Sequence, residues 1–135
     1  MLQDREKAIK LYVRAADLGC SQAHFKLGDI YHEGGDMKKA KFHFEAAAMA
    51  GHEVARCNLG GLEAESGNTK RAHKHWTIAA SAGHYIAMIE LRKSFEQGLV
   101  SRESTDSTLT AYNYSCAEMR SEARGGSIRA LTETI

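Results

Sequence analysis

The sequence predicts an all-α protein of stacked helix-turn-helix repeats, with about seven helices in total. Three observations support this prediction: an internal repeat of 32 residues, apolar residues at helical spacing, and a complete lack of proline. A chain of 135 residues is long enough for one domain. Because proline removes an amide donor and clashes with the preceding turn, its absence allows helices to continue without interruption.

The repeat is the main feature of the sequence. The blocks Asp4–Gly35, Asp36–Gly67 and Asn68–Leu99 align without an insertion. Six columns are identical in all three blocks: Ala8/Ala40/Ala72, Ala15/Ala47/Ala79, Ala16/Ala48/Ala80, Gly19/Gly51/Gly83, Ala23/Ala55/Ala87 and Leu27/Leu59/Leu91. A further column is aromatic, with Tyr12, Phe44 and Trp76. A helical unit of this length cannot bury its apolar face alone, so the copies are expected to stack.

Each block contains signals for two helices of about 13–15 residues joined by turns of two to four. Asp36 is a suitable N-cap after the Gly34-Gly35 turn, and Asp4 and Asn68 occupy the same column. Gly51 ends the first predicted helix of the second block, since a left-handed residue is favoured there. The second helix of that block closes at Ser66-Gly67.

The last part of the chain departs from the repeat. Trp76 and Tyr112 are 36 residues apart, so four residues are inserted in the turn Gly98–Asp106. The last helix is predicted near Ser104–Arg124, with Thr108 in the alanine column and Ser115-Cys116 in place of the alanine pair. Gly125-Gly126 is expected to end it. The predicted organisation is an array over residues 1–124, with a half-repeat at 4–19, repeats at 20–51 and 52–83 and a degenerate repeat at 84–124, followed by a frayed tail at 125–135.

The repeated motif is A-x3-LG in one helix and KA-x3-aromatic-x2-AA-x2-G in the next. It occurs in full as Ala23, Leu27, Gly28, Lys39, Ala40, Phe44, Ala47, Ala48 and Gly51, and again, with arginine for lysine, as Ala55, Leu59, Gly60, Arg71, Ala72, Trp76, Ala79, Ala80 and Gly83. This pattern resembles the Sel-one-like repeat family, relatives of the tetratricopeptide repeats, over roughly Asp4 to Arg124. The resemblance implies a right-handed α-α superhelix, or solenoid, and a role as a scaffold or adaptor in protein complexes. The period of 32 is shorter than the family's common one of about 36.

The family's order places the A-x3-LG helix first, whereas this chain begins with the second helix of a unit. Capping repeats normally present a polar outer face. The helix Asp4–Leu18 instead carries Ile9, Leu11, Tyr12 and Val13. We therefore expect either a partial product of a longer array or self-association through this uncapped N-terminal helix.

In related repeats the first helix of each unit lines the concave surface, and the resemblance implies a partner-binding face there. Its predicted residues are Gln22, Lys26, Asp29, Glu33, Asn58, Glu65, Glu90 and Lys93, with Glu53 and Gln97 beside them. Asn58 holds the asparagine position of an N-L-G motif, and its amide offers both a donor and an acceptor to a partner's backbone. The alternative is that Asn58 is solvated or bonds a neighbouring repeat. Acidic neighbours argue against a clamp for a C-terminal carboxylate.

The histidines and cysteines do not form a recognisable metal or catalytic motif. His73 and His75 diverge by about 200° on a helix, and the column Cys20/His52/His84 is interpreted as architectural. Zinc-site spacings are absent, so no metal or cofactor is predicted. Cys57 could act as a nucleophile only with a base beside it, which leaves a hydrolase as a rival hypothesis. The prediction is that the chain is not an enzyme.

Charge and hydropathy exclude several classes of partner. A net charge of +1 argues against nucleic acid and anionic lipid as partners. No apolar run approaches the roughly 20 residues of a membrane helix, and the start MLQDREKAIK lacks the apolar region of a secretory signal. With three widely spaced cysteines, a reducing compartment is expected, and the predicted location is cytoplasmic. The predicted function is a protein-interaction scaffold or adaptor; the alternative is a substrate-recruiting arm of a larger protein, such as a ubiquitin-ligase or quality-control subunit.

Overall fold

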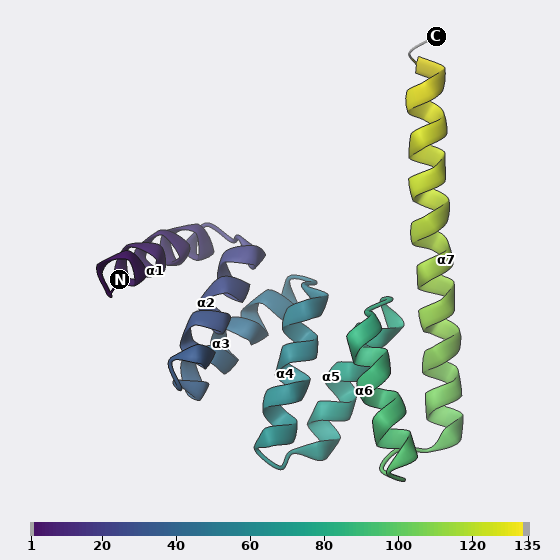
Figure 1. Ribbon diagram of the computed structural model, residues 1–135, viewed down its shortest axis with the longest axis horizontal. Helices are drawn as coiled ribbons and strands as arrows, with labels where there is room; N and C mark the ends of the chain where they lie inside the picture. The colour runs from purple at the N-terminus through teal and green to yellow at the C-terminus, as the bar shows by residue number, and fades with distance from the viewer. Residues whose placement is uncertain (1, 134–135) are drawn as a thin grey trace. The chain divides into compact units, whose positions relative to one another are not determined.

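The computed structural model describes the backbone of residues 2–133 and the side chains of residues 3–121. Its helices are α1 (Leu2–Asp17), α2 (Ser21–Glu33), α3 (Met37–Met49), α4 (Glu53–Glu65), α5 (Thr69–Ser81), α6 (Tyr85–Glu96) and α7 (Arg102–Glu133) (Figure 1). No strand occurs within residues 2–133, and the predicted all-α helical repeat is confirmed. The chain divides into two compact units, Met1–Trp76 and Thr77–Ile135.

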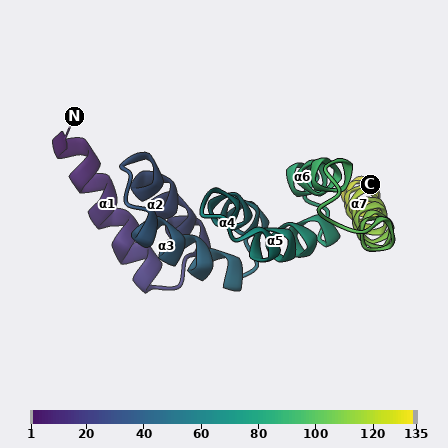
Figure 2. The ribbon, with the colours of Figure 1, turned by 90° about the horizontal axis from the view of Figure 1, so that it is seen from below.

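The first unit contains α1 to α4 and the beginning of α5. Within it α2 contacts both α1 and α3, and α3 contacts α4 (Figure 2). Short turns at residues 18–20, 34–36, 50–52 and 66–68 join successive helices, as predicted. Gly51 ends α3 with φ of +92°, a left-handed conformation that costs little for a residue without Cβ.

The predicted N-caps differ in outcome. The Asp36 carboxylate accepts a hydrogen bond of 3.1 Å from the Lys39 amide at the start of α3, which confirms the prediction. Asn68 directly precedes α5, and its carbonyl accepts the Ala72 amide. The prediction for Asp4 is wrong, because α1 begins at Leu2 and Asp4 lies in its first turn. At that position its carboxylate interacts favourably with the helix dipole.

The aromatic column of the repeat fills the space between helices. Phe44 is buried, and a Cβ atom placed on Gly28 of α2 would lie 2.5 Å from its Cε1 atom. The same ring belongs to a buried cluster with Ala55 and Leu59 of α4. Phe44 of α3 therefore contacts helices on both sides, and the glycine of the LG motif is required for the ring to approach α2.

The second unit contains the end of α5 together with α6 and α7. The Ser115 hydroxyl of α7 donates a hydrogen bond of 2.7 Å to the Ser81 carbonyl, and Thr108 is buried, as Ala40 and Ala72 of its predicted column are. Helix α6 has 12 residues where α2 and α4 have 13. As a result the left-handed turn residue is Gly98 (φ +75°), one position before the repeat register.

Helix α7 corrects two predictions about the C-terminal part. It begins at Arg102 rather than near Ser104, because the Ser101 hydroxyl accepts the Ser104 amide as an N-cap. It also continues through Gly125-Gly126 to Glu133, so the predicted stop at these glycines is wrong, whereas the predicted frayed tail at 125–135 stays a prediction. Glycine lowers helix stability by about 1 kcal/mol without forbidding the helical conformation. Residues 134 and 135 lie outside the described residues.

Candidate partner-binding surface

The predicted partner-binding residues of the first unit occupy matching positions on α2 and α4. On each helix the positions are spaced i, i+4, i+7 and i+11, which places them on one side of the helix. We call this set the A-helix face; it consists of Gln22, Lys26, Asp29 and Glu33 on α2, and of Val54, Asn58, Gly61 and Glu65 on α4. Of the predicted members, Gln22, Glu33 and Glu65 are exposed, whereas Lys26, Asp29 and Asn58 are half-buried.

His52 joins the two helices of this face. Its Nδ1 atom accepts the Ala55 amide at 3.1 Å and so caps α4. With Nδ1 as the acceptor, the proton is on Nε2, which donates to Gln22 Oε1 at 2.8 Å. The imidazole also stacks on the Phe25 ring with centroids 4.5 Å apart. Gln22 is therefore held in place by α4.

Charges of both signs lie together on α2. Burial raises the pKa of the Asp29 carboxyl above its ordinary value, the positive charge of Lys26 opposes this rise, and Glu33 adds to it. The Lys26 ammonium lies 5.8 Å from the centroid of the Phe25 ring. The structure thus brings Gln22, Lys26 and Asp29 of the predicted set together next to the start of α4.

Two members of the face were missed by reasoning from the sequence. Gly61 is half-buried, but a Cβ atom on it would meet no atom within 4 Å, so there is open space beside the α4 backbone at this point. Val54 is 39% exposed and places an apolar side chain at the N-terminal end of the same face. Both residues share repeat columns with predicted members, since Val54 aligns with Gln22 and Gly61 aligns with Asp29. The repeat register was the signal that could have identified them.

Glu65 lies at the other end of the face, beside a buried ion pair. It lines a cavity of about 270 Å³ together with Met37, Lys41, Leu62, Glu63 and Ser66. Glu63 has only 3% of its side chain exposed, and its oxygens accept from Lys41 Nζ at 2.7 Å and Asn68 Nδ2 at 2.8 Å. The hydrogen bond from Lys41 lowers the pKa of Glu63, with a further contribution from Asn68, against the opposing effect of burial.

Glu63 was also missed by reasoning from the sequence. The signal that could have identified Glu63 is a carboxylate in a column that holds the aromatic residues Tyr31 and Phe95 in the other blocks. Because both Glu63 oxygens are engaged, its role in this arrangement is to join α3, α4 and the start of α5.

A pair of histidines links α2 and α3 within the first complete helix pair. The Nδ1 atoms of His24 and His43 are 3.1 Å apart, so one ring carries the proton and the other accepts it. Burial lowers the pKa of His43, and the neighbouring His24 and Lys39 lower it further. In the next block the corresponding residues are Arg56 and His75, whose nearest nitrogens are 3.5 Å apart. Because a polar contact occurs at the same two columns in both blocks, these columns are a recurring point of contact between the paired helices.

The comparison with known families agrees with this helix pairing. A family model described as Sel1 repeat matches residues 1–20, 21–52 and 53–84. The chain belongs to the Sel1 repeat family. Sel1 repeats generally act as scaffolds for protein interactions. No curated protein and no solved structure matches the chain significantly.

The Sel1 matches agree with the helices of the structure. The matches at 21–52 and 53–84 each cover a pair of helices, α2–α3 and α4–α5, with the LG helix first. The match at 1–20 covers α1, which corresponds to the second helix of a pair. Residues 85–135 lie outside the Sel1 matches, so the predicted degenerate repeat at 84–124 stays a prediction.

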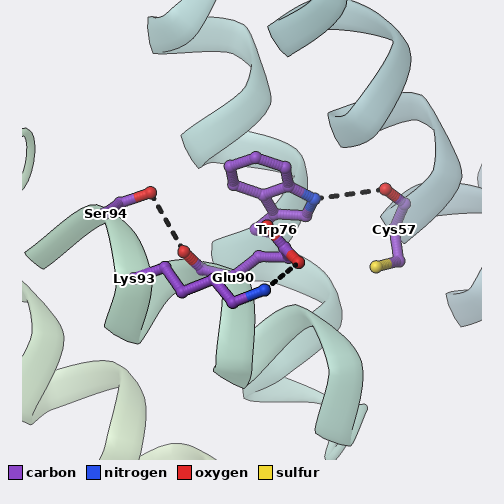
Figure 3. A network of polar contacts seen from close by, with 5 residues as sticks. All are labelled: Cys57, Trp76, Glu90, Lys93 and Ser94. Atoms are coloured by element: carbon purple, nitrogen blue, oxygen red, sulfur yellow. Dashed lines mark hydrogen bonds and ion pairs between the residues drawn. The ribbon is translucent and has the colours of Figure 1, made fainter. Parts of the chain in front are cut away.

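The predicted site residues of the second unit lie on α6. Lys93 Nζ is 3.5 Å from Glu90 Oε1, and the Ser94 hydroxyl donates to the Glu90 carbonyl at 3.0 Å (Figure 3). Glu90 is half-buried and Lys93 is exposed. An ion pair this accessible to solvent contributes little to stability, so both charged groups can exchange their contact for another one.

The cysteine and histidine positions have structural roles in this Sel1 repeat chain. Cys57 is buried, and its carbonyl accepts the Trp76 Nε1 proton at 3.2 Å (Figure 3). A buried thiol is not presented to a substrate, which removes support for the hydrolase hypothesis. Cys20, His52 and His84 each directly precede a helix, and of these three side chains only that of His52 accepts a cap hydrogen bond, so the architectural interpretation of their column stays a prediction.

The described part of the chain has neither a cluster for a metal ion nor a helix that could span a membrane. Among these residues there is no group of three or more histidine, cysteine, aspartate or glutamate side chains placed to hold a metal ion. None of the described helices combines the length and the apolar character needed to cross a membrane.

Proposed function

We propose that this chain is a protein-interaction scaffold that binds a segment of a partner protein along the A-helix face of α2 and α4. The open backbone at Gly61 is the observation that carries the proposal, because another chain can approach α4 there without meeting a side chain. The same face also has an apolar side chain at Val54 and polar groups at Lys26 and Asn58. This mixture of apolar and polar groups is typical of non-obligate protein interfaces.

Each part of the face has a distinct role in the proposed binding. The Asn58 amide can donate to and accept from a partner's backbone, which gives it affinity without a strict requirement for sequence. Lys26 and Asp29 select for complementary charges in the partner segment. The contacts of His52 with Gln22 and Phe25 hold α2 against α4 before binding, which limits the ordering cost on association.

The test combines site-specific crosslinking with a blocking substitution. A photo-crosslinking amino acid is placed at Glu33 on the face, and in a second protein at Glu45, an exposed position of α3. The same partner peptide should be captured from position 33 and not from position 45. Gly61→Leu should abolish capture while the thermal unfolding midpoint does not fall, because the added side chain enters open space.

Glu45→Leu is the matched control, since it places the same side chain at an exposed position on a second helix of a pair. Equal capture from positions 33 and 45, or undiminished capture by the Gly61→Leu protein, would contradict the assignment of this face.

The narrower alternative is that the same face recruits substrates as an arm of a larger protein, such as a ubiquitin-ligase or quality-control subunit. This alternative uses the same residues and adds one requirement. A partner captured at position 33 should be ubiquitylated or degraded more slowly in cells that express the Gly61→Leu protein than in cells that express the natural chain.

A further inference from the structure

The cavity at the end of the A-helix face lies between the start of α3 and the end of α4. Its lining residues come from these two helices and from the turn after α4, and its volume is about 270 Å³. The preceding block has a matching place between the start of α1 and the end of α2. In the alignment of the blocks, Met37 corresponds to Arg5, Leu62 to Ile30 and Ser66 to Gly34.

An arginine of the chain itself occupies the matching place in the preceding block. Nη2 of Arg5 donates a hydrogen bond of 3.2 Å to the carbonyl of Ile30, in the last turn of α2. A Cβ atom placed on Gly34 would lie 2.7 Å from the same Nη2 atom. The guanidinium therefore packs on the end of α2, where the partial negative charge of the last carbonyls favours a cation.

Two differences in sequence leave the place between α3 and α4 without such a group. Met37 stands where Arg5 does, and its uncharged side chain is 46% exposed. Ser66 stands where Gly34 does, and its hydroxyl donates to the Leu62 carbonyl at 3.0 Å. Because a hydroxyl is much smaller than a guanidinium, a cavity remains beside this carbonyl.

The charges around the cavity favour a cation as its occupant. Its lining includes one positive charge, Lys41, and two negative charges, Glu63 and Glu65, so their sum is −1. Lys41 and Glu63 are paired with each other at 2.7 Å. Glu65 is exposed and takes part in none of the ion pairs among the described side chains. Its carboxylate is therefore available to a charged group of another molecule.

An arginine side chain matches both the apolar and the charged part of the lining. Met37 and Leu62 provide apolar surface for its methylene stem. Its guanidinium can donate two parallel hydrogen bonds to the two oxygens of Glu65, which the point charge of a lysine cannot do. The cation would also lie at the end of α4, as that of Arg5 lies at the end of α2.

We propose that this cavity binds an arginine side chain of the partner segment, with the guanidinium on Glu65 and the stem on Met37 and Leu62. The proposal rests on the proposed function, because Glu65 belongs to both the cavity and the A-helix face. It adds a requirement for the sequence of the partner, which needs an arginine where its segment passes the end of α4.

The first experiment adds N-acetyl-arginine amide to the full chain and follows the ¹³C-labelled methyl groups of methionine and leucine by NMR. The signals of Met37 and Leu62 should shift in a saturable manner. The signal of Met49, an exposed residue of the same helix α3, should not shift. N-acetyl-citrulline amide has nearly the same shape without the charge and should bind at least about fivefold more weakly.

The charge of Glu65 is tested by its neutral isostere. Glu65→Gln should weaken binding of the arginine amide at least about fivefold, because it removes the acceptor of the paired hydrogen bonds. Glu45→Gln is the matched control, since it removes the same charge from an exposed position of α3 outside the cavity, and it should bind as the natural chain does.

Met37→Arg gives the chain the arginine that the preceding block already has. The new side chain should fill the cavity from within and abolish the shift of the Leu62 methyl signals. The thermal unfolding midpoint should not fall, since position 37 is already 46% exposed. Met49→Arg, the same substitution at a position that is 83% exposed, should leave binding unchanged.

The partner segment provides a second test. The segment captured from position 33 is synthesised as a peptide, and each of its arginines is replaced in turn by citrulline. One of these replacements should weaken binding to the natural chain at least about fivefold. The same replacement should have little effect on binding to the Met37→Arg protein, because the cavity is then occupied.

The outcomes separate this proposal from the assignment of the face. Equal binding of the arginine and citrulline amides, or unchanged binding by the Met37→Arg protein, would overturn the cavity proposal even where Gly61→Leu abolishes capture. Arginine-specific binding together with equal capture from positions 33 and 45 would support the cavity and contradict the face. A dimer in sedimentation that Met37→Arg dissociates would also overturn the proposal, since a second copy would then supply the arginine.

Discussion

Trp76 lies so close to Gly60 that a Cβ atom on this glycine would stand 2.4 Å from the indole Nε1 atom. At the next residue, Gly61, a Cβ atom would meet nothing within 4 Å. Two adjacent glycines of one helix therefore serve different purposes. Gly60 allows an aromatic ring to approach, and Gly61 leaves open space beside the backbone.

We expect opposite effects on stability from the same substitution at these two glycines. Gly60→Ala should lower the free energy of unfolding by about 1–3 kcal/mol, because the Trp76 ring must shift. Gly61→Ala should raise it by about 0.5–1 kcal/mol, because alanine favours the helix and enters open space. Urea unfolding followed by circular dichroism measures both. Effects of the same sign would mean that the two glycines are not distinguished in solution.

The ion pair between Lys41 and Glu63 has an apolar counterpart in the preceding block. There the same two columns hold Ile9 and Tyr31, which both pack on the cluster that contains Leu27. Lys41→Ile alone should cost about 1–3 kcal/mol, because it leaves a buried carboxylate with Asn68 as its remaining partner. The double substitution Lys41→Ile/Glu63→Tyr should recover most of this loss, since apolar replacements of buried pairs are often neutral.

A thermodynamic cycle of the two single variants and the double variant measures this coupling. Additive losses would show that Lys41 and Glu63 contribute independently of each other.

The histidine pair predicts a dependence of stability on pH. The folded chain lowers the pKa of His43 below its ordinary value of 6.5, mainly by burial. Below pH 6.5 the unfolded chain therefore binds a proton more readily than the folded chain does. The stability that His43 contributes is complete above this pH and is lost as the pH falls through the lowered pKa. Thermal unfolding between pH 7.5 and 5.0 should show this loss.

The natural repeat supplies the control for this measurement. His24→Met/His43→Leu introduces the residues that α6 and α1 carry in the same columns, Met88 and Leu11. The double variant should show a smaller decrease in unfolding midpoint below pH 6.5. Part of the decrease should remain, because burial also lowers the pKa of His73 and of His75. An unchanged pH profile would assign the acid sensitivity to other groups.

The N-cap of α3 gives a fourth prediction. Asp36→Ala removes the acceptor of the Lys39 amide and should lower the free energy of unfolding by about 1 kcal/mol. Asp36→Ser keeps an acceptor at this position and should retain most of the stability in the same urea titration. Equal losses in the two variants would indicate that the charge of Asp36, rather than the hydrogen bond, is important.

The repeat columns predicted the fold better than they predicted the surface. The alanine, glycine and aromatic columns identified the buried positions and the turns, because packing constraints recur every 32 residues. The start of α1 and the course of α7 were not predicted, since Asp4 and Gly125-Gly126 favour an end of a helix without enforcing it. Glu63 was missed because its burial depends on Lys41 and Asn68, which lie on other elements.

The position of Phe44 between Gly28 on one side and Leu59 on the other has a consequence for how the first unit unfolds. If either neighbouring helix detaches, water reaches a ring that the remaining helix cannot enclose by itself. The loss of one helix is therefore expected to weaken the hold on the next, so that α2, α3 and α4 should exchange their amide protons as one cooperative block. Among the described residues, those of α1 cluster with α2, and we expect α1 to open ahead of that block.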